Sequence, residues 1–322
     1  MSTTIELEEP GSLNTHNRVS PQVQDNKMQK WDLTMLLGLM SLPPDGLMLA
    51  EKGLARWRDD FFGTFSDRPS RFRAQLRSCA GIIAGSAVIR AAGQRLGSAQ
   101  PSIGWDSATD VFIPQCFYET FCTFVLKELG GTSMECTTYP HGSTAYYISE
   151  RRVIHTRRAV LCIHCTVDAC PLVAVAASRL DIQLSFISAD VLCIAYPWAL
   201  AYKKAAVRPV GASQTDPTAK MYTQKYERRG YAFEVPWIVE TNACKPHGMC
   251  PKATRFFGDE HCLTVVFPDV SSSHSLMPAS GDKLHITALW TFGGPPCGNQ
   301  SCSLHVDPAI QYSTICAPIP LY

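Results

Sequence analysis

The pattern of hydrophobic and polar positions divides the chain into a polar start, a hydrophobic middle and a Ser-, Gly- and Pro-rich end. Residues 1–28 lack hydrophobic periodicity, which predicts a disordered tail. In residues 29–75, leucines and tryptophans recur at helical spacing on both sides of the Pro43-Pro44 pair, which predicts short N-terminal helices. The last segment, 271–322, predicts a partly ordered tail with one strand at 284–292.

Short apolar segments in the middle of the chain predict buried strands. The segment at 80–89 is rich in small and β-branched residues, and it suits a buried strand or turn that enters a helix. A tightly packed helix crossing is the alternative for this segment. Segments at 111–113 and 191–196 predict two further strands, each followed by a proline.

Two amphipathic helices are expected between and after these strands. The first covers 118–129 and ends at Gly130-Gly131, and the second runs from the Asp216-Pro217 start to about 229. Lys225, Arg228 and Arg229 lie in the last turn of the second helix. Because cations are stabilised there by the helix dipole, these side chains need no ligand to explain them.

A hairpin and a late strand complete the predicted sheet. The hairpin has strands at 145–148 and 159–167, joined by a polar turn through Glu150-Arg151-Arg152, and the late strand covers 263–267. Strands and helices alternate without a repeated βαβ period. The fold class is therefore predicted to be α+β, with a mixed sheet flanked by helices.

Composition changes this picture mainly by exclusion. The chain has 322 residues, of which 46% are hydrophobic, and a formal net charge of +1. There is thus no strong signal for nucleic-acid binding, since such binding needs a basic field. The acidic start Glu6-Leu7-Glu8-Glu9 does not resemble a secretory signal, and the apolar runs are too short or too polar for membrane spans. We therefore expect an intracellular protein, cytoplasmic or nuclear, without a membrane partner.

Fourteen cysteines need a separate explanation in an intracellular chain. Most lie in apolar segments and are interpreted as small buried hydrophobic residues. Cys244, His247, Cys250 and Cys262 differ, because they form a Cys-rich loop whose ligands suit structural zinc. Free thiols are an alternative, and a disulfide between Cys262 and one of the other two cysteines is another.

Several segments in a fixed order carry a resemblance. These are 84–87, 105–114, 189–197, 225–231 and 250–262. Together they resemble a family of uncharacterised mushroom-type fungal (basidiomycete) proteins, whose first half is similar to a nucleotidyltransferase fold. The resemblance covers roughly residues 35–268.

The resemblance implies a set of site residues and shows where the set is incomplete. Gly85 and Ser86 match the nucleotide-binding turn, and Asp110 matches the second carboxylate of an Asp-x-Asp pair. The other two carboxylate positions correspond to Ala108 and His164. Since two Mg²⁺ ions need several oxygen ligands, a single carboxylate does not support phosphoryl transfer.

Three functional hypotheses follow. The first is a pseudoenzyme: a non-catalytic nucleotidyltransferase-like protein that binds a nucleotide or a protein partner. The second is a diverged Mg-dependent nucleotidyltransferase that uses Asp110 and His164, with Asp106 reaching in from the preceding loop and Asp168 or Asp181 replacing the third carboxylate. The third is a protein-interaction adaptor built on the N-terminal helices. The expected organisation is a tail at 1–28, helices at 29–75, a nucleotidyltransferase-like core at 76–205, a helical Cys-rich extension at 206–270 and a tail at 271–322.

Overall fold

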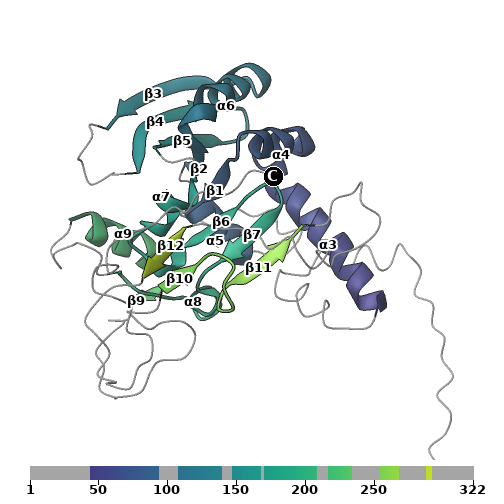
Figure 1. Cartoon of the computed structure of the whole chain (residues 1–322), viewed down its shortest axis with the longest axis vertical. Coiled ribbons are helices and arrows are strands. Elements are labelled where there is room, and N and C mark those ends of the chain that lie inside the picture. The colour runs from purple at the N-terminus through teal and green to yellow at the C-terminus, as the bar shows by residue number, and fades with distance from the viewer. Residues whose placement is uncertain are drawn as a thin grey trace, which may run out of the picture.

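The computed structural model describes residues 44–93, 108–139, 147–167, 170–208, 217–233, 254–267 and 288–291. Within these residues, the main feature is an eight-stranded sheet with helices on both faces (Figure 1). Its strand order is β11-β7-β6-β1-β2-β5-β4-β3. The strands are β1 Ile82–Ala84, β2 Thr109–Pro114, β3 Thr132–Thr138, β4 Ile148–His155, β5 Val160–Thr166, β6 Ser185–Ile187, β7 Val191–Ile194 and β11 Leu263–Val266.

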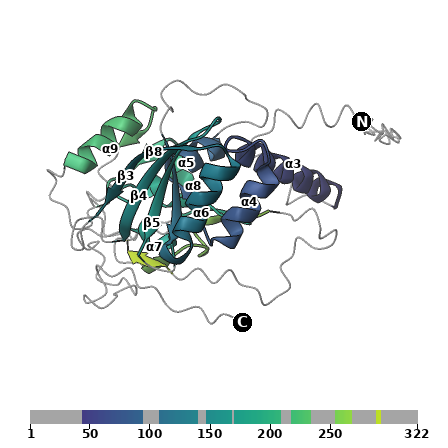
Figure 2. The same ribbon diagram turned by 90° about the horizontal axis from the view of Figure 1, so that it is seen from above.

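The helices and two small sheets surround this main sheet (Figures 1 and 2). The helices are α3 Pro44–Gly63, α4 Pro69–Ser78, α5 Ser86–Gly93, α6 Gln115–Glu128, α7 Leu172–Ala176, the 3-10 helix η1 Asp181–Gln183, α8 Pro197–Ala201 and α9 Pro217–Glu227. One small sheet pairs β10 Thr254–Phe256 with β12 Leu289–Thr291, and the other pairs β8 Lys204–Ala205 with β9 Ala232–Phe233.

The main sheet is mixed, as predicted. Strands β2 and β5 run parallel, and the other neighbours within this sheet are antiparallel. In the parallel pair, Asp110 lies opposite Cys162 and Phe112 lies opposite His164. Because side chains alternate between the two faces of a strand, these four side chains share one face.

The opposite face of the same strands forms the larger hydrophobic core. Val111 and Ile113 of β2 and Leu161 and Ile163 of β5 are fully buried there with residues of α3, α4 and α6. A second buried cluster lies on the face of Asp110, and it includes residues of α7, α8, α9 and β12. The strand alternation therefore places the candidate chemistry on the face covered by the C-terminal elements.

The described part of the predicted N-terminal helices, from Pro44 on, contributes to the main core. Helix α3 begins at Pro44, the second residue of the predicted proline break. Trp57 of α3 stacks on Phe61 at 5.9 Å between ring centroids and also contacts Phe267. Phe72 of α4 contacts Phe121 of α6 edge to face at 6.0 Å. Aromatic packing thus joins residues from both ends of the described chain into one core.

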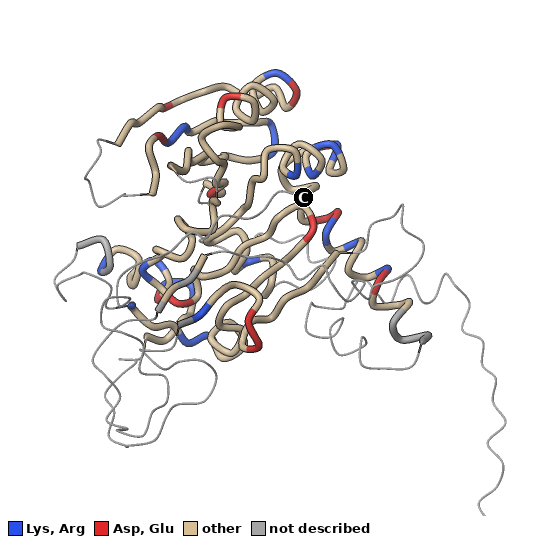
Figure 3. Tube along the Cα trace, viewed as in Figure 1, with Lys and Arg blue, Asp and Glu red and all other residues tan. Residues whose placement is uncertain are grey.

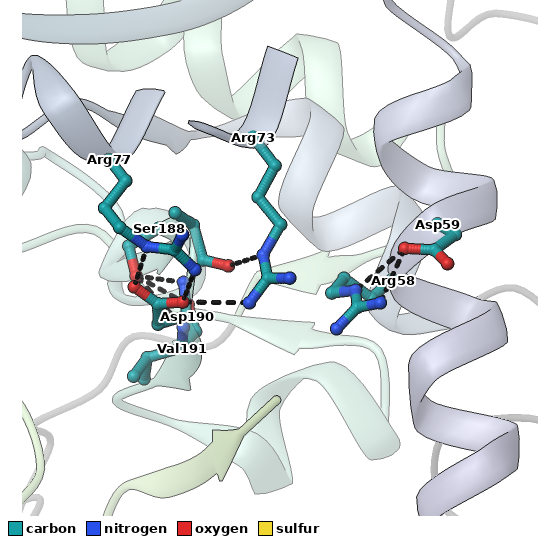
Figure 4. Close-up of polar contacts among 8 residues, drawn as sticks. Arg58, Asp59, Arg73, Arg77, Ser188, Asp190 and Val191 are labelled. Carbon is teal, nitrogen blue, oxygen red and sulfur yellow. Dashed lines mark hydrogen bonds and ion pairs between the residues drawn. The ribbon is translucent and has the colours of Figure 1, made fainter. Parts of the chain in front are cut away.

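An arginine clamp fixes α4 to the turn between β6 and β7 (Figure 4). Arg73 donates hydrogen bonds to the Ala189 carbonyl at 2.5 Å and to Asp190 Oδ1 at 2.9 Å, and Arg77 Nε donates to Asp190 Oδ2 at 2.8 Å. The backbone N–H groups of Asp190 and Val191 donate to the Ser188 hydroxyl, which shapes the turn. The basic positions of α4 are blue in Figure 3. The clamp therefore joins two elements that are far apart in the sequence.

The hairpin prediction is wrong in its boundaries. Glu150, Arg151 and Arg152 lie inside β4, and the turn forms at Thr156, whose hydroxyl accepts a hydrogen bond from the Ala159 N–H at 3.0 Å. Charged side chains fit in the strand because each finds a partner; Arg152, for example, is paired with Glu150 and with Glu119 of α6. Strand β3 was not predicted, since its residues are almost all exposed and carry no apolar pattern.

Other predictions are confirmed within the described residues. The segment at 80–89 is strand β1 followed by α5, and the two amphipathic helices are α6 and α9. Strands β7, β11 and β12 lie in the predicted segments.

Among the helices that the structure describes, none has the length and apolar character needed to cross a membrane. The tail at 1–28 lies outside the described residues.

Candidate functional site

A glycine turn brings the start of α5 against the carboxylate of Asp110. Ala84, the last residue of β1, is the register partner of Asp110 on β2. Gly85 follows with φ +68°, a left-handed conformation that favours glycine, and a Cβ at this position would lie 3.1 Å from Asp110 Oδ2. Ser86 is the first residue of α5 and is buried. The structure therefore brings Gly85, Ser86 and Asp110 together.

Asp110 forms a hydrogen bond with His164 of the neighbouring strand. The Nε2 atom of His164 lies 3.0 Å from Asp110 Oδ1, and the His164 ring stacks on Phe112 with centroids 4.7 Å apart. Burial disfavours the charged imidazolium, but the hydrogen bonds to Asp110 and Cys162 outweigh it and raise the pKa of His164 to about 9. The contact with Asp110 therefore favours the protonated form of His164.

Cys162 completes a cluster of three metal-ligating residue types. Ligand atoms of Asp110, Cys162 and His164 all lie within 4.8 Å of one another. Arg151 of β4 donates a hydrogen bond from Nε to the sulfur of Cys162 at 3.0 Å. The His164 side chain is 12% exposed and that of Asp110 is 35% exposed, so the cluster is open to solvent on the side of Asp110.

Helix α9 and the turn that follows it bring basic side chains to the glycine turn. The Ser86 hydroxyl lies 3.1 Å from the Tyr226 hydroxyl, and Arg229 Nη1 donates a hydrogen bond to the same Ser86 oxygen at 2.8 Å. Burial and the neighbouring Arg229 lower the pKa of Lys225, while Asp110 acts in the opposite direction. Burial also lowers the pKa of Arg229, with Arg90 of α5 contributing in the same direction. The turn is therefore in an electropositive environment.

These contacts extend two interpretations made from the sequence. Lys225 and Arg229 were explained by the helix dipole, yet Arg229 bonds the turn that the resemblance singles out and Lys225 is electrostatically coupled to Asp110. Cys162 was predicted to be a small buried residue, and it is buried, but it also lies beside His164. The alternation of side chains along β5 could have indicated this neighbour, because Cys162 and His164 are two residues apart and share one face of the strand.

The remaining candidate residues lie elsewhere or outside the described chain. Asp106, Asp168, Cys244, His247 and Cys250 are among the residues that the structure does not describe. The other two candidates, Cys262 and Asp181, are described. The sulfur of Cys262 lies 3.6 Å from Arg255 Nη2, and the Asp181 carboxylate accepts hydrogen bonds from the backbone N–H groups of Ile182 and Ala206. Neither belongs to the cluster around Asp110.

The chain was compared with known proteins in three ways. No protein family matches it. No curated protein matches it, and no solved structure does. The functional interpretation therefore depends on the geometry of the site.

Proposed function

We propose that this chain is a non-catalytic nucleotidyltransferase-like protein that binds the phosphates of a nucleotide at the Gly85-Ser86 turn. The observation that carries the proposal is the hydrogen bond from Arg229 to the Ser86 hydroxyl at the first residue of α5. Helix N-termini attract anions, and a guanidinium beside one adds a charged, multidentate phosphate donor. Lys225 and Arg90 add positive charge close to the same turn.

The order of elements supports a nucleotidyltransferase-like arrangement. A short strand, a glycine turn and a helix are followed by the strand of Asp110, a second helix and the strand of His164. The resemblance implies the same order of turn, carboxylate and third site position. Gly85 leaves room for the carboxylate of Asp110, because a side chain there would lie against Oδ2.

The contact between Asp110 and His164 supports the absence of phosphoryl transfer. Two Mg²⁺ ions need several anionic oxygen ligands while they neutralise the reacting phosphates. Here the carboxylate of Asp110 is already hydrogen-bonded to His164, with 3.0 Å between Oδ1 and Nε2. Ala108 has no ligand to offer at the position of the first carboxylate. The residues present thus favour binding over catalysis with magnesium.

Calorimetric titration of the full chain with ATP, CTP and GTP tests the binding. Arg229→Gln and Ser86→Ala are each expected to weaken nucleotide binding by roughly tenfold, because each removes one polar partner of the phosphates. Arg228→Gln is the matched control, since Arg228 is the exposed neighbour of Arg229 in the turn that follows α9. Absence of binding by all three nucleotides, or equal losses in Arg229→Gln and Arg228→Gln, contradicts the proposal.

The dependence of nucleotide binding on Mg²⁺ distinguishes the non-catalytic proposal from the hypothesis of a diverged enzyme. Nucleotide binding is expected to be similar with and without Mg²⁺ and to survive in Asp110→Asn. Binding that requires Mg²⁺ and disappears in Asp110→Asn, together with release of pyrophosphate, would replace the proposal with a diverged nucleotidyltransferase. The adaptor hypothesis is tested by an N-terminal truncation. The truncation should remove only residues before Pro44, where α3 begins, because Trp57 of α3 and Phe72 of α4 are core residues.

A further inference from the structure

We propose that Asp110, Cys162 and His164 form a zinc-class metal site, with one carboxylate oxygen, one thiolate sulfur and one imidazole nitrogen as ligands. The site lies beside the nucleotide-binding turn, but it does not depend on the proposed function. It differs from the predicted zinc loop, which uses Cys244, His247, Cys250 and Cys262.

The geometry of two neighbouring strands carries the proposal. Asp110 and Cys162 are direct register partners on the parallel strands β2 and β5, and His164 lies two residues further along β5 on the same face. The ligand atoms lie within 4.8 Å of one another, with 3.0 Å between those of Asp110 and His164. Ligands about 2.0–2.3 Å from a common zinc ion lie within 4 Å of one another, so small side-chain rotations close the set.

The donor atoms select the class of metal. A sulfur, a nitrogen and a carboxylate oxygen suit a borderline metal such as Zn²⁺ or Co²⁺, whereas Mg²⁺ prefers oxygen ligands alone. Three protein ligands leave one position of a tetrahedron open for water or an anion. Asp110 is more exposed than His164, and its second oxygen lies close to Gly85.

The two ring nitrogens of His164 have different surroundings. The Nε2 atom lies 3.0 Å from Asp110 Oδ1, so it is the nitrogen placed to bind an ion together with the carboxylate. The Nδ1 atom is buried on the other side of the ring, and no residue in the described ranges forms a hydrogen bond with it. Zn²⁺ binding needs a thiolate and a neutral imidazole nitrogen, so metal binding is expected to release protons.

The surrounding residues hold the ligands in place. Phe112 stacks on the His164 ring and fixes its plane. Arg151 donates to the sulfur of Cys162 from the adjacent strand β4, and this bond can remain when the thiolate binds a metal. Outer hydrogen bonds of this kind orient metal ligands and affect affinity by roughly tenfold or more.

Cobalt substitution of the full chain tests the site directly. After chelator treatment, added Co²⁺ is expected to give a thiolate-to-cobalt charge-transfer absorption that Cys162→Ser abolishes. Cys165→Ser is the matched control, because Cys165 is a buried cysteine of the same strand whose side chain lies in the opposite core. Zinc titration is expected to show a loss of roughly tenfold or more in Asp110→Asn and His164→Gln.

Three results would contradict the proposed metal site. A cobalt spectrum unchanged in Cys162→Ser, or zinc affinity unchanged in Asp110→Asn, contradicts the site, as does zinc binding lost only in Cys250→Ser. Asp110 is partly exposed, so Asp110→Asn keeps the test valid if Cys162→Ser does not fold. All titrations are made without nucleotide. Failure here, with nucleotide binding still sensitive to Arg229→Gln, leaves the proposed function standing.

Discussion

Replacing Asp181 with asparagine is expected to stabilise the folded chain above pH 7. Asp181 is fully buried in η1, and its Oδ1 atom accepts hydrogen bonds from the N–H groups of Ile182 at 2.7 Å and Ala206 at 2.9 Å. Its Oδ2 atom is buried and has no hydrogen-bond partner within the described ranges. Burial raises the pKa of Asp181 to about 7, although the backbone N–H groups and Arg208 act in the opposite direction.

The sign and size of the effect follow from this pKa. The ordinary value is 3.8, so between pH 3.8 and about pH 7 the unfolded chain loses the proton while the folded chain keeps it. The free energy of unfolding therefore falls as pH rises through this window. At about 1.4 kcal/mol for each pH unit, the loss is about 4 kcal/mol above pH 7. Asparagine keeps the carbonyl acceptor and cannot ionise, so Asp181→Asn avoids this loss.

Chemical denaturation at pH 5 and pH 8 measures the effect. The free energy of unfolding of Asp181→Asn, relative to that of the wild type, is expected to be about 3 kcal/mol higher at pH 8 than at pH 5. Asp190→Asn is a suitable control, because the pKa of Asp190 is lowered by its arginine partners and its contribution has the opposite pH dependence. Parallel pH profiles for the wild type and Asp181→Asn would refute the reasoning.

Three further predictions concern the fold and the turn. Asp190→Asn should lower the free energy of unfolding by about 1 kcal/mol at pH 7, since the half-exposed carboxylate of the arginine clamp is lost, and this difference should vanish at low pH in urea titrations. Phe72→Ala should cost about 3–5 kcal/mol, measured by urea denaturation, because its ring is fully buried among other aromatic rings; a loss under 1 kcal/mol would contradict the core packing. Gly85→Ala should cost about 1–2 kcal/mol for its left-handed backbone and displace the Asp110 carboxylate; thermal melting and nucleotide titration together check both effects.

Local sequence patterns were sufficient for the turn at the centre of the site. Small residues around Gly85 predicted a strand entering a helix, and the structure has this arrangement. The segment around Asp110 was predicted as a strand because apolar residues surround the carboxylate and a proline ends it. Both signals are local, since they depend on backbone conformation and side-chain burial within a few residues.

Long-range partners could not be predicted in the same way. The pairing of Arg229 with Ser86 joins residues 143 positions apart, and a terminal arginine in a helix has an adequate local explanation. Arg152 was assigned to a turn because it is charged, whereas its partner Glu119 lies on another element. The contact between Cys162 and Asp110 depends on the parallel register of two strands, which the pattern of either strand alone does not define.

The alternation along β2 and β5 has a consequence for how this fold can change during evolution. Val111, Ile113 and Ile163 pack the main core on one face, whereas Asp110 and His164 are on the other. Substitutions at the site positions therefore leave the main core intact, so ligands can be lost, exchanged or regained while the sheet persists. A lineage with such a scaffold can drift away from one chemistry and acquire another without passing through an unfolded protein.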